Sequence, residues 1–571
     1  MIYKFSIFLL LFFVFSFSFK TDESFDQDLG RHLKLGEIIW QTKLVPSTNL
    51  FSYTNPDFRV IDHHYLFQVL VYLSSISFGL TSILFFKLII LLLSVFLILK
   101  TVSKNKYWLI LPIGFIFLHV LRQRTEARPE IFSFLFASIN LYILEKFRND
   151  KTKLIFLLPI VQLIWANTHI YFPVGFFIQG IYLVDFLFRR NKSFKLIGLV
   201  LGLSVLVSLI TPNGLVGLLY PFEILKGYGY TIAENQTMFL LESIGFSDPN
   251  FLFVKICIGL IISSLIVGLL RKNLSIRSFG LSALGLGFAL QNVRSFPYLF
   301  FISFFAVIEQ FGVINKRIFI QILVILAVVL ILFESFGYLS GSYYRSTDSS
   351  KQVGLNFNQS LKGGIDFVQN QKLEGPIFNN FDIGSYIIYR EYPRLKVFVD
   401  GRPEAYPSNF FDGAYKPIQS DVVNWKMAEE KYNFKTIIFS HTDQTPWGAA
   451  FLKTITKNPN WKIVYLDDFS IVLVKNEVIE EKKIDVIDLD KLDPSNFKFE
   501  NHVSYLRIGI FLLNQEELES AHKFAKKSLE VFPDSPLGNR LMAYFLSNQD
   551  GVFVSPLLPK YLDKANGSVF W

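Results

Sequence analysis

The chain has 571 residues, of which 51% are hydrophobic and only 18% are charged, and 63 of them are phenylalanine. A soluble domain carries about 25% charged residues, so a wholly soluble, disordered or collagen-like protein is excluded. The net charge of +9 lies in short clusters rather than in a basic stripe, which excludes a nucleic-acid-binding surface, and the single cysteine, Cys257, excludes an intramolecular disulfide.

Long apolar blocks in the first 338 residues predict an α-helical polytopic membrane protein. A membrane span needs about 20 mostly apolar residues, and about 17 suffice, so we expect about eleven spans. No small-residue cleavage pattern follows the first block, which favours an uncleaved span over a signal peptide. The blocks are 5–19, 80–99, 107–121, 131–144, 154–166, 171–188, 196–210, 251–270, 278–291, 296–313 and 318–338.

The gaps between these blocks predict an orientation. Alternate gaps are short and basic, whereas gaps 20–79, 122–130, 167–170, 211–250 and 292–295 hold the other polar residues. The positive-inside rule puts the basic gaps and the N-terminus in the cytoplasm, and everything after about 339 outside the cytoplasmic membrane. The basic residues are Lys100, Lys104, Lys106, Lys146, Arg148, Lys151, Lys153, Arg189, Arg190, Lys192, Lys195, Arg271, Lys272, Arg277, Lys316 and Arg317.

The composition changes after the membrane domain 1–338. Short strands expected at 376–380, 396–400, 435–440, 461–466 and 470–475 alternate with helices near 361–370, 417–432 and 447–457, which predicts a small α/β domain over 339–476. A charged linker, 477–500, follows. Segment 501–571 is expected to be helical and resembles one tetratricopeptide repeat, with a tail.

The first long loop, 20–79, carries the strongest chemical signal. Its stretches 29–40 and 64–78 have the pattern of amphipathic helices that lie in a membrane interface. Asp26 and Asp28 stand at the mouth of the first span, where two carboxylates suit a general base, a metal ligand or solvated loop charge.

The order of motifs resembles one family, the bacterial GT-C membrane glycosyltransferases related to protein O-mannosyltransferases and lipid A aminoarabinose transferases. In the first loop these are Asp26-Gln27-Asp28, His32, Val45-Pro46, Phe51-Ser52-Tyr53-Thr54 and His64; then Arg122 to Glu130, Trp165-Ala166-Asn167-Thr168-His169, Thr211 to Gly214, Glu234-Asn235-Gln236 and Gln291-Asn292-Val293-Arg294. Phe378 to Tyr386 and Phe398 to Tyr406 resemble the tail of an uncharacterised branch. Gly30 and Arg31 depart from the family, which often has aromatic residues there, and so does Pro212.

The resemblance implies transfer of a sugar from a polyprenyl-phosphate donor to an acceptor hydroxyl or amine at the outer membrane face, with the inversion that is usual in the family. An acceptor hydroxyl is a poor nucleophile until a base takes its proton, and Asp26 or Asp28 is the expected catalytic base. A lipid-phosphate leaving group needs cationic donors, for which the candidates are Arg122, Arg124, Arg128 and Arg294. Candidates for positioning the substrates are His32, His64, Glu126, Asn167, His169 and Glu234.

Each assignment has a structural alternative. Arginines at span ends commonly anchor the helix in the interface, and Asn167 and His169 suit hydrogen bonding at a helix end. Some relatives use a divalent cation and others do not; no zinc-type spacing is present, so we assign no metal. The ionisable residues within blocks, Lys87, Asp185, Lys255 and Glu334, are interpreted as structural.

Three other functions stay open on the sequence. A ligase or polymerase of lipid-linked glycans would share the outer-face chemistry. A secondary transporter would carry polar, broken helices and internal repeats, which are not evident here. A non-catalytic scaffold would display the soluble tail. The expected partners are the lipid bilayer, the polyprenyl-phosphate sugar and an acceptor of unknown class, with no nucleic acid.

Overall fold

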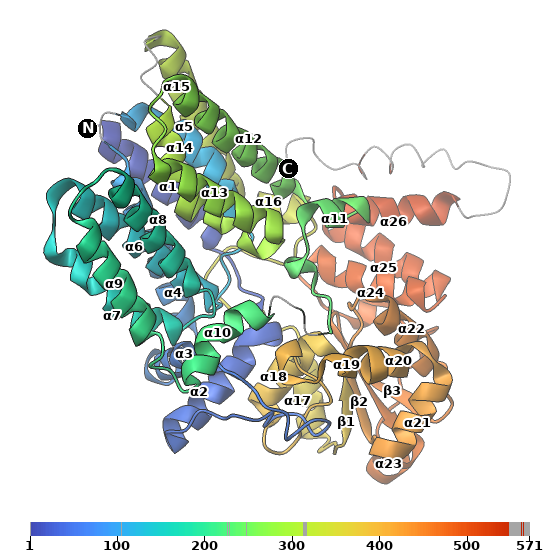
Figure 1. The fold of residues 1–571 in the computed structure, drawn as a ribbon. Helices are drawn as coiled ribbons and strands as arrows, with labels where there is room; N and C mark the ends of the chain where they lie inside the picture. The colour runs from blue at the N-terminus through green and yellow to red at the C-terminus, as the bar shows by residue number, and fades with distance from the viewer. Residues whose placement is uncertain are drawn as a thin grey trace.

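The structure is a computed structural model that describes residues 2–103, 106–224, 227, 229–246, 248–311, 317–547, 561 and 564. Among the predicted basic residues, Lys104 and Lys316 lie outside the described residues, as does most of the predicted tail after residue 547. The described chain forms a helical bundle, a small α/β domain at one end of it, and a helical C-terminal segment (Figure 1).

Each predicted apolar block becomes one or more helices of the bundle. Prolines stand in the first turn of α7, α8 and α12, where the missing N–H costs nothing because it would have no helical partner. The bundle helices are α1(Ile2–Ser18), α4(Thr81–Thr101), α5(Tyr107–Leu118), α6(Glu130–Asp150), α7(Leu158–Ala166), α8(Pro173–Phe188), α9(Phe194–Val207), α12(Pro249–Leu270), α13(Ile276–Gln291), α14(Phe304–Gln310) and α15(Arg317–Leu339).

Among the described residues, three helices are long and apolar enough to cross a bilayer: Thr81–Thr101, Pro249–Leu270 and Ile320–Leu339. On α12 and α15, large apolar side chains point away from the protein, and more than half of Leu252, Ile325 and Phe336 is exposed. Exposed apolar surface of this extent suits lipid rather than water. The chain is a membrane protein; the expected count of about eleven spans stays a prediction, because the other bundle helices are shorter or, in the case of α6, more charged.

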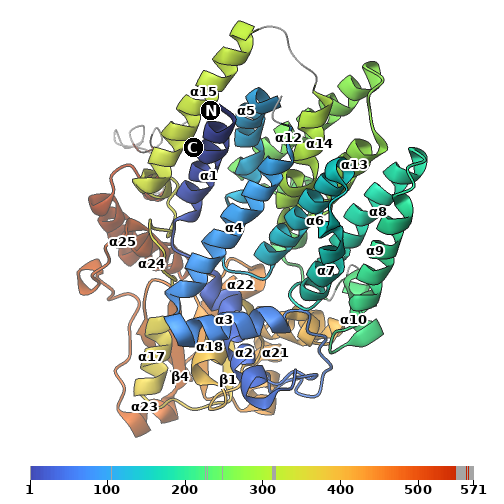
Figure 2. The same ribbon diagram turned by 90° about the vertical axis from the view of Figure 1, so that its left-hand side faces the viewer.

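The first long loop forms two helices, as its pattern predicts. α2(Gly30–Thr42) follows one turn of π-helix, η1(Phe25–Leu29), and α3(Tyr65–Phe78) lies across the end of the bundle rather than along it (Figure 2). Two shorter helices of the 211–250 region, α10(Gly214–Glu223) and α11(Met238–Ser243), lie between α9 and α12 in the chain.

The α/β domain is built on a mixed four-stranded sheet in the order β1-β2-β4-β3. β1 pairs parallel with β2, with Phe378 opposite Ile437, and the other two pairs are antiparallel. Its elements are α16(Ser342–Ser346), α17(Lys362–Asn370), β1(Ile377–Asn379), α18(Gly384–Glu391), α19(Ser408–Phe410), α20(Lys416–Ser420), α21(Val422–Tyr432), β2(Thr436–Ser440), α22(Pro446–Ile455), β3(Trp461–Leu466) and β4(Ser470–Lys475).

The prediction of a strand at 396–400 is wrong. Val397 forms an isolated bridge with Ser52 instead, donating its N–H to the carbonyl of Phe51 at 3.1 Å and accepting from Tyr53 at 3.3 Å. The backbone of Val397 is therefore bonded to the first loop, while the N–H of Phe398 and the carbonyl of Val399 bond the side chain of Asn379 at the end of β1. The residues that follow, Gly401 to Glu404, are carried to the junction between the domain and the bundle.

The first loop and the α/β domain share one hydrophobic core. Phe25, Leu29 and Leu33 of the loop are buried in the same cluster as Ile377 and Ile387 of the domain. Apolar burial is the largest stabilising contribution in folding, so this shared core holds the loop against the domain. The two form one structural unit at the end of the bundle.

The predicted linker and C-terminal segment are mostly helical. They form α23(Asn476–Lys482), α24(His502–Asn514), α25(Leu518–Val531) and α26(Pro536–Ser547); the likeness to a tetratricopeptide repeat stays a prediction. Asp348, just after the last bundle helix, accepts hydrogen bonds from His502 Nε2 at 2.8 Å, Ser535 Oγ at 2.7 Å and the N–H of Leu537 at 2.6 Å. One carboxylate thus fixes the segment to the exit of the bundle.

Two buried ion-pair groups hold the bundle together. Lys87 of α4 lies 2.9 Å from Asp22 of the first loop, and both side chains are almost fully buried. At the other end, the fully buried Arg277 pairs with Glu145 of α6 and Glu309 of α14. The ionisable residues expected to be structural therefore include one, Lys87, that connects a span to the first loop.

Candidate functional site: a charged cavity between bundle, loop and domain

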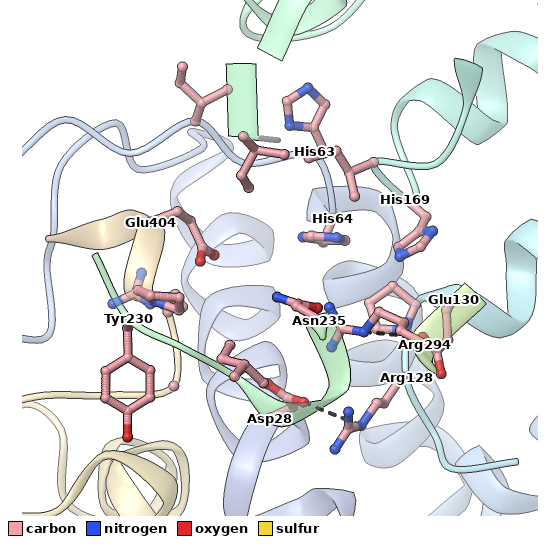
Figure 3. A pocket seen from close by; sticks show the side chains of 18 of the residues that line it. Asp28, His63, His64, Arg128, Glu130, His169, Tyr230, Asn235, Arg294 and Glu404 are labelled. Atoms are coloured by element: carbon pink, nitrogen blue, oxygen red, sulfur yellow. Dashed lines mark ion pairs between the residues drawn. The ribbon is translucent and has the colours of Figure 1, made fainter. Parts of the chain in front are cut away.

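A cavity of about 710 Å³ lies where the first loop, the end of the bundle and the α/β domain meet (Figure 3). Five acidic and five basic described side chains line it, so the cavity is strongly polar but not predominantly basic. They are Asp28, Asp62, Glu130, Glu404 and Asp412, and Arg31, Arg128, Arg294, Arg402 and Lys416.

The two candidate bases point to different places. Asp28 lines the cavity, with Oδ1 2.9 Å from Arg31 Nη2 and Oδ2 3.3 Å from Arg128 Nε. Burial would raise the pKa of Asp28, but the two guanidinium groups outweigh it and lower the pKa. Asp26 does not line the cavity: its Oδ2 accepts the N–H of Ser360 at 2.9 Å, and burial raises its pKa to about 7.

Three predicted phosphate-binding arginines gather around Glu234. Arg124 Nη1 lies 2.8 Å, Arg128 Nη1 3.2 Å and Arg294 Nη2 3.4 Å from Glu234 Oε2. Burial would raise the pKa of this glutamate, but the arginines outweigh it and lower the pKa. Of the three, Arg128 and Arg294 line the cavity, so their guanidinium groups can reach an anion placed there.

Three imidazoles form one wall of the cavity. The ring of His64 lies 5.8 Å from that of His32 and 5.5 Å from that of His169, centroid to centroid. Burial lowers the pKa of all three, to about 4 for His64, so they are neutral at pH 7. Neutral imidazoles both donate and accept hydrogen bonds, which suits contact with sugar hydroxyls.

The other candidates lie outside the cavity lining. Arg122 donates to Asn250 Oδ1 at 2.7 Å and to the Tyr338 hydroxyl at 3.2 Å, and thus ties helices together. Asn167 donates to the carbonyl of Leu163 at 2.8 Å, the helix-end role that was its structural alternative.

Glu126 also lies outside the lining. Its carboxylate is 3.3 Å from Arg128 Nε and 3.4 Å from Lys351 Nζ. It therefore contacts the site only through Arg128.

The departure from the family at Gly30 and Arg31 has a physical reason. A Cβ on Gly30 would lie 2.7 Å from the carbonyl oxygen of Ser385, so only glycine lets the first turn of α2 approach α18 this closely. Arg31 donates its N–H to Ser385 Oγ at 2.9 Å and its guanidinium to Asp28. These two residues dock the first loop on the domain.

From the sequence, Arg402, Glu404 and Asp412 are interpreted as turn residues of an accessory domain, with acceptor or partner binding as the functional alternative for that domain, and they are not placed in the cavity. Gly401 lies against the first loop, where an added Cβ would be 2.9 Å from the carbonyl oxygen of Gln27. Arg402, Glu404, Asp412 and Lys416 follow it into the lining. The run from Val399 to Glu404 was visible in the sequence, but only its pairing with the first loop shows that it faces the cavity.

The donor set does not fit a divalent cation. Among the described residues, no three His, Cys, Asp or Glu side chains converge as a metal site requires. Asp28 and Glu234, the carboxylates nearest the arginines, are each occupied by guanidinium groups. No step of the reaction below passes through a metal.

No protein-family model and no curated protein sequence matches the chain. Among solved structures, the oligosaccharyltransferase AglB from the archaeon Archaeoglobus fulgidus, in complex with an inhibitory peptide and a dolichol-phosphate, matches with a TM-score of 0.54 at 11% identity over 93% of this chain and 86% of that one. The chain has the GT-C fold.

Two further structures with the GT-C fold are similar at lower scores. The arabinofuranosyltransferase AftD from Mycobacteria has a TM-score of 0.49 at 11% identity, covering 83% of this chain and 40% of that one. ArnT from Cupriavidus metallidurans bound to undecaprenyl phosphate has a TM-score of 0.45 at 12% identity, covering 82% of this chain and 96% of that one. The match to AglB confirms the GT-C fold expected from the motifs, and the activity is a separate question.

Proposed function

We propose that the chain is a membrane glycosyltransferase that moves a sugar from a polyprenyl-phosphate donor to an acceptor hydroxyl or amine. The observation that carries this proposal is the cavity at the end of the bundle, where Arg128 and Arg294 face a space also bordered by Asp28 and three neutral imidazoles. The dolichol-phosphate in the AglB structure, which shares the fold, supports a lipid-linked donor.

In this reaction the acceptor oxygen or nitrogen forms a bond to the anomeric carbon while the bond from that carbon to the phosphate oxygen breaks. Arg128 and Arg294 stabilise the negative charge that develops on the leaving phosphate. Asp28 takes the acceptor proton, and attack opposite the leaving group inverts the anomeric centre. Because phosphate competes for Arg128, donor binding weakens the ion pair that lowers the basicity of Asp28.

The positions of the basic clusters support an outer-face site. Lys106 donates to the carbonyl of Ile308 at 3.2 Å, and Arg148 and Arg277 both pair with Glu309, so three clusters meet at the far end of α14. The segment from Arg294 to Glu309 runs from the cavity to this end. With the basic end cytoplasmic, the cavity and the α/β domain face outward. Reporter fusions near residues 103 and 345 should then report opposite sides; the same side for both would refute this orientation.

The function is tested by transfer of radiolabelled sugar from a panel of polyprenyl-phosphate sugars in membranes that contain the chain. Asp28→Asn should lower transfer by about 100-fold or more, the usual contribution of a general base. Asp26→Asn should retain most of the activity, since Asp26 lies outside the lining. Asp57→Asn, an exposed change in the same loop, is the matched control. Full activity in Asp28→Asn would refute the assignment of the base, and transfer from no donor would count against the proposed function.

A further inference from the structure

Glu404 presents to the cavity a carboxylate that accepts a hydrogen bond from its own backbone N–H and has no cationic side chain paired with it among the described residues. It lies in the 3-10 turn Pro403–Ala405 of the α/β domain, and its side chain is turned toward the middle of the cavity (Figure 3). Among the described residues, no side chain forms an ion pair or hydrogen bond with it. Buried or half-buried carboxylates in proteins are normally paired, so this one lacks a counterpart.

The cationic side chains near Glu404 are already paired with other carboxylates. Each basic side chain on this side of the cavity holds another carboxylate at short distance, so its charge is largely cancelled. The pairs are Arg31–Asp28 at 2.9 Å, Arg402–Asp400 at 2.7 Å and Lys416–Asp412 at 2.6 Å. Consistently, burial raises the pKa of Glu404 despite the opposing effects of Arg31 and Arg402.

An aromatic cluster of the domain borders the same cavity. Tyr230 lines the cavity too, but its ring points away from Glu404 (Figure 3) and stacks on Phe381 with ring centroids 4.4 Å apart. The ammonium of Lys416 already lies over this cluster, 5.9 Å from the Tyr230 ring and 5.0 Å from that of Trp447. Aromatic faces attract ammonium groups, so these rings hold the charge of Lys416 at the cluster, and Lys416 is not left free to pair with Glu404.

We propose that Glu404 is a specificity-determining residue that binds an ammonium group on the acceptor. The proposal rests on the proposed function, since the donor phosphate is assigned to Arg128 and Arg294 on the bundle side, which leaves the domain side for the acceptor. An incoming ammonium supplies the missing counter-charge, whereas a neutral hydroxyl does not. The acceptor class is therefore amine-bearing, and Glu404 orients it without taking part in bond making.

The test measures binding to the full-length protein in nanodiscs, without donor, so that it does not depend on turnover. The probe is the tripeptide Gly-Lys-Gly capped at both ends, compared with the same peptide acetylated on the lysine. We expect the ammonium form to bind wild type about tenfold tighter or more, because a charge-assisted hydrogen bond is about twice as strong as a neutral one. This preference should decrease as the pH falls and Glu404 takes up a proton.

The variants separate recognition from folding. Glu404→Gln should bind the two peptides equally, Glu404→Asp should recover part of the preference, and Asp412→Asn, a matched change of a paired and exposed carboxylate in the same lining, should keep it. Equal or undetectable binding of the two peptides to wild type overturns the proposal, and so does a preference that survives in Glu404→Gln. If wild type transfers sugar from no donor but still prefers the ammonium peptide, the proposed function is refuted and the binding site at Glu404 is retained.

Discussion

The buried pair between Lys87 and Asp22 leads to the sharpest stability prediction. Lys87→Met removes the ammonium but keeps most of the side-chain volume. Asp22 would keep its bonds from the N–H groups of Ser24, at 3.0 Å, and Ala127, at 2.8 Å, but would lose its counter-charge in a site that is about 1% exposed. Removing one partner of a buried pair costs about 3–5 kcal/mol, and we expect a loss of this size.

The assay is equilibrium unfolding in mixed micelles, for wild type, Lys87→Met and Lys87→Met/Asp22→Asn. The double variant should recover most of the lost stability, because the amide introduced at position 22 would carry no charge and its oxygen could still accept a backbone bond. A loss below about 1 kcal/mol in Lys87→Met, the value of an exposed pair, would refute the reasoning, since it would mean that water reaches Asp22.

The same pair predicts a pH dependence. Burial would raise the pKa of Asp22, but Lys87 and the bonds from Ser24 outweigh it and lower the pKa below its unfolded value. The stabilisation is therefore present at neutral pH and is lost as the pH falls through the acid range. In Lys87→Met burial acts without the opposing ammonium and raises the pKa, so the stability difference between wild type and variant should shrink on acidification. A difference that stays constant as the pH is lowered to about 3, below the ordinary range of an aspartate, would contradict this.

Two further changes test the packing around the site. Gly30→Ala places a Cβ 2.7 Å from the carbonyl oxygen of Ser385 and should cost about 1–3 kcal/mol in unfolding experiments, with a matching loss of sugar transfer; Gly180→Ala, where nothing lies within 4 Å, should cost neither. Arg277→Gln leaves the buried Glu145 and the partly exposed Glu309 with only the more distant Arg148 as a cation, and should lower the free energy of unfolding by about 1–3 kcal/mol, whereas the exposed Arg271→Gln should change it little. Equal losses in Gly30→Ala and Gly180→Ala, or in Arg277→Gln and Arg271→Gln, would argue against the packing described.

The sequence indicates the bundle well because long apolar runs leave little choice of structure in a membrane. Block 251–270, for example, becomes the helix Pro249–Leu270. The strand expected at 396–400 failed for the opposite reason: its apolar residues are buried, but the backbone partners of Val397 lie in residues 51–53 of a distant segment. Pairing between distant segments leaves no trace in local pattern.

The sequence indicates candidate residues for the site, but it does not show which of them face the cavity. Asp26 and Asp28 are the same residue type two positions apart, and the turn of π-helix that holds them decides that one faces the cavity and the other Ser360. Likewise Arg122 and Arg128 share one basic loop, yet the first packs on Tyr338 and the second lines the cavity. Side-chain direction at a helix end depends on packing that a motif does not encode.

The docking of the first loop on the α/β domain also means that the cavity is completed late in translation. Arg31 and its partner Ser385 are 354 positions apart. At a synthesis rate of about 5–20 residues per second, the loop is made roughly 20–70 s before the segment that completes its core. During that interval the nascent membrane half has its aspartates and arginines but no closed cavity. The cavity between the first loop and the domain therefore forms only when the last third of the polypeptide has been made and has folded, so late translation is the step that completes the candidate site.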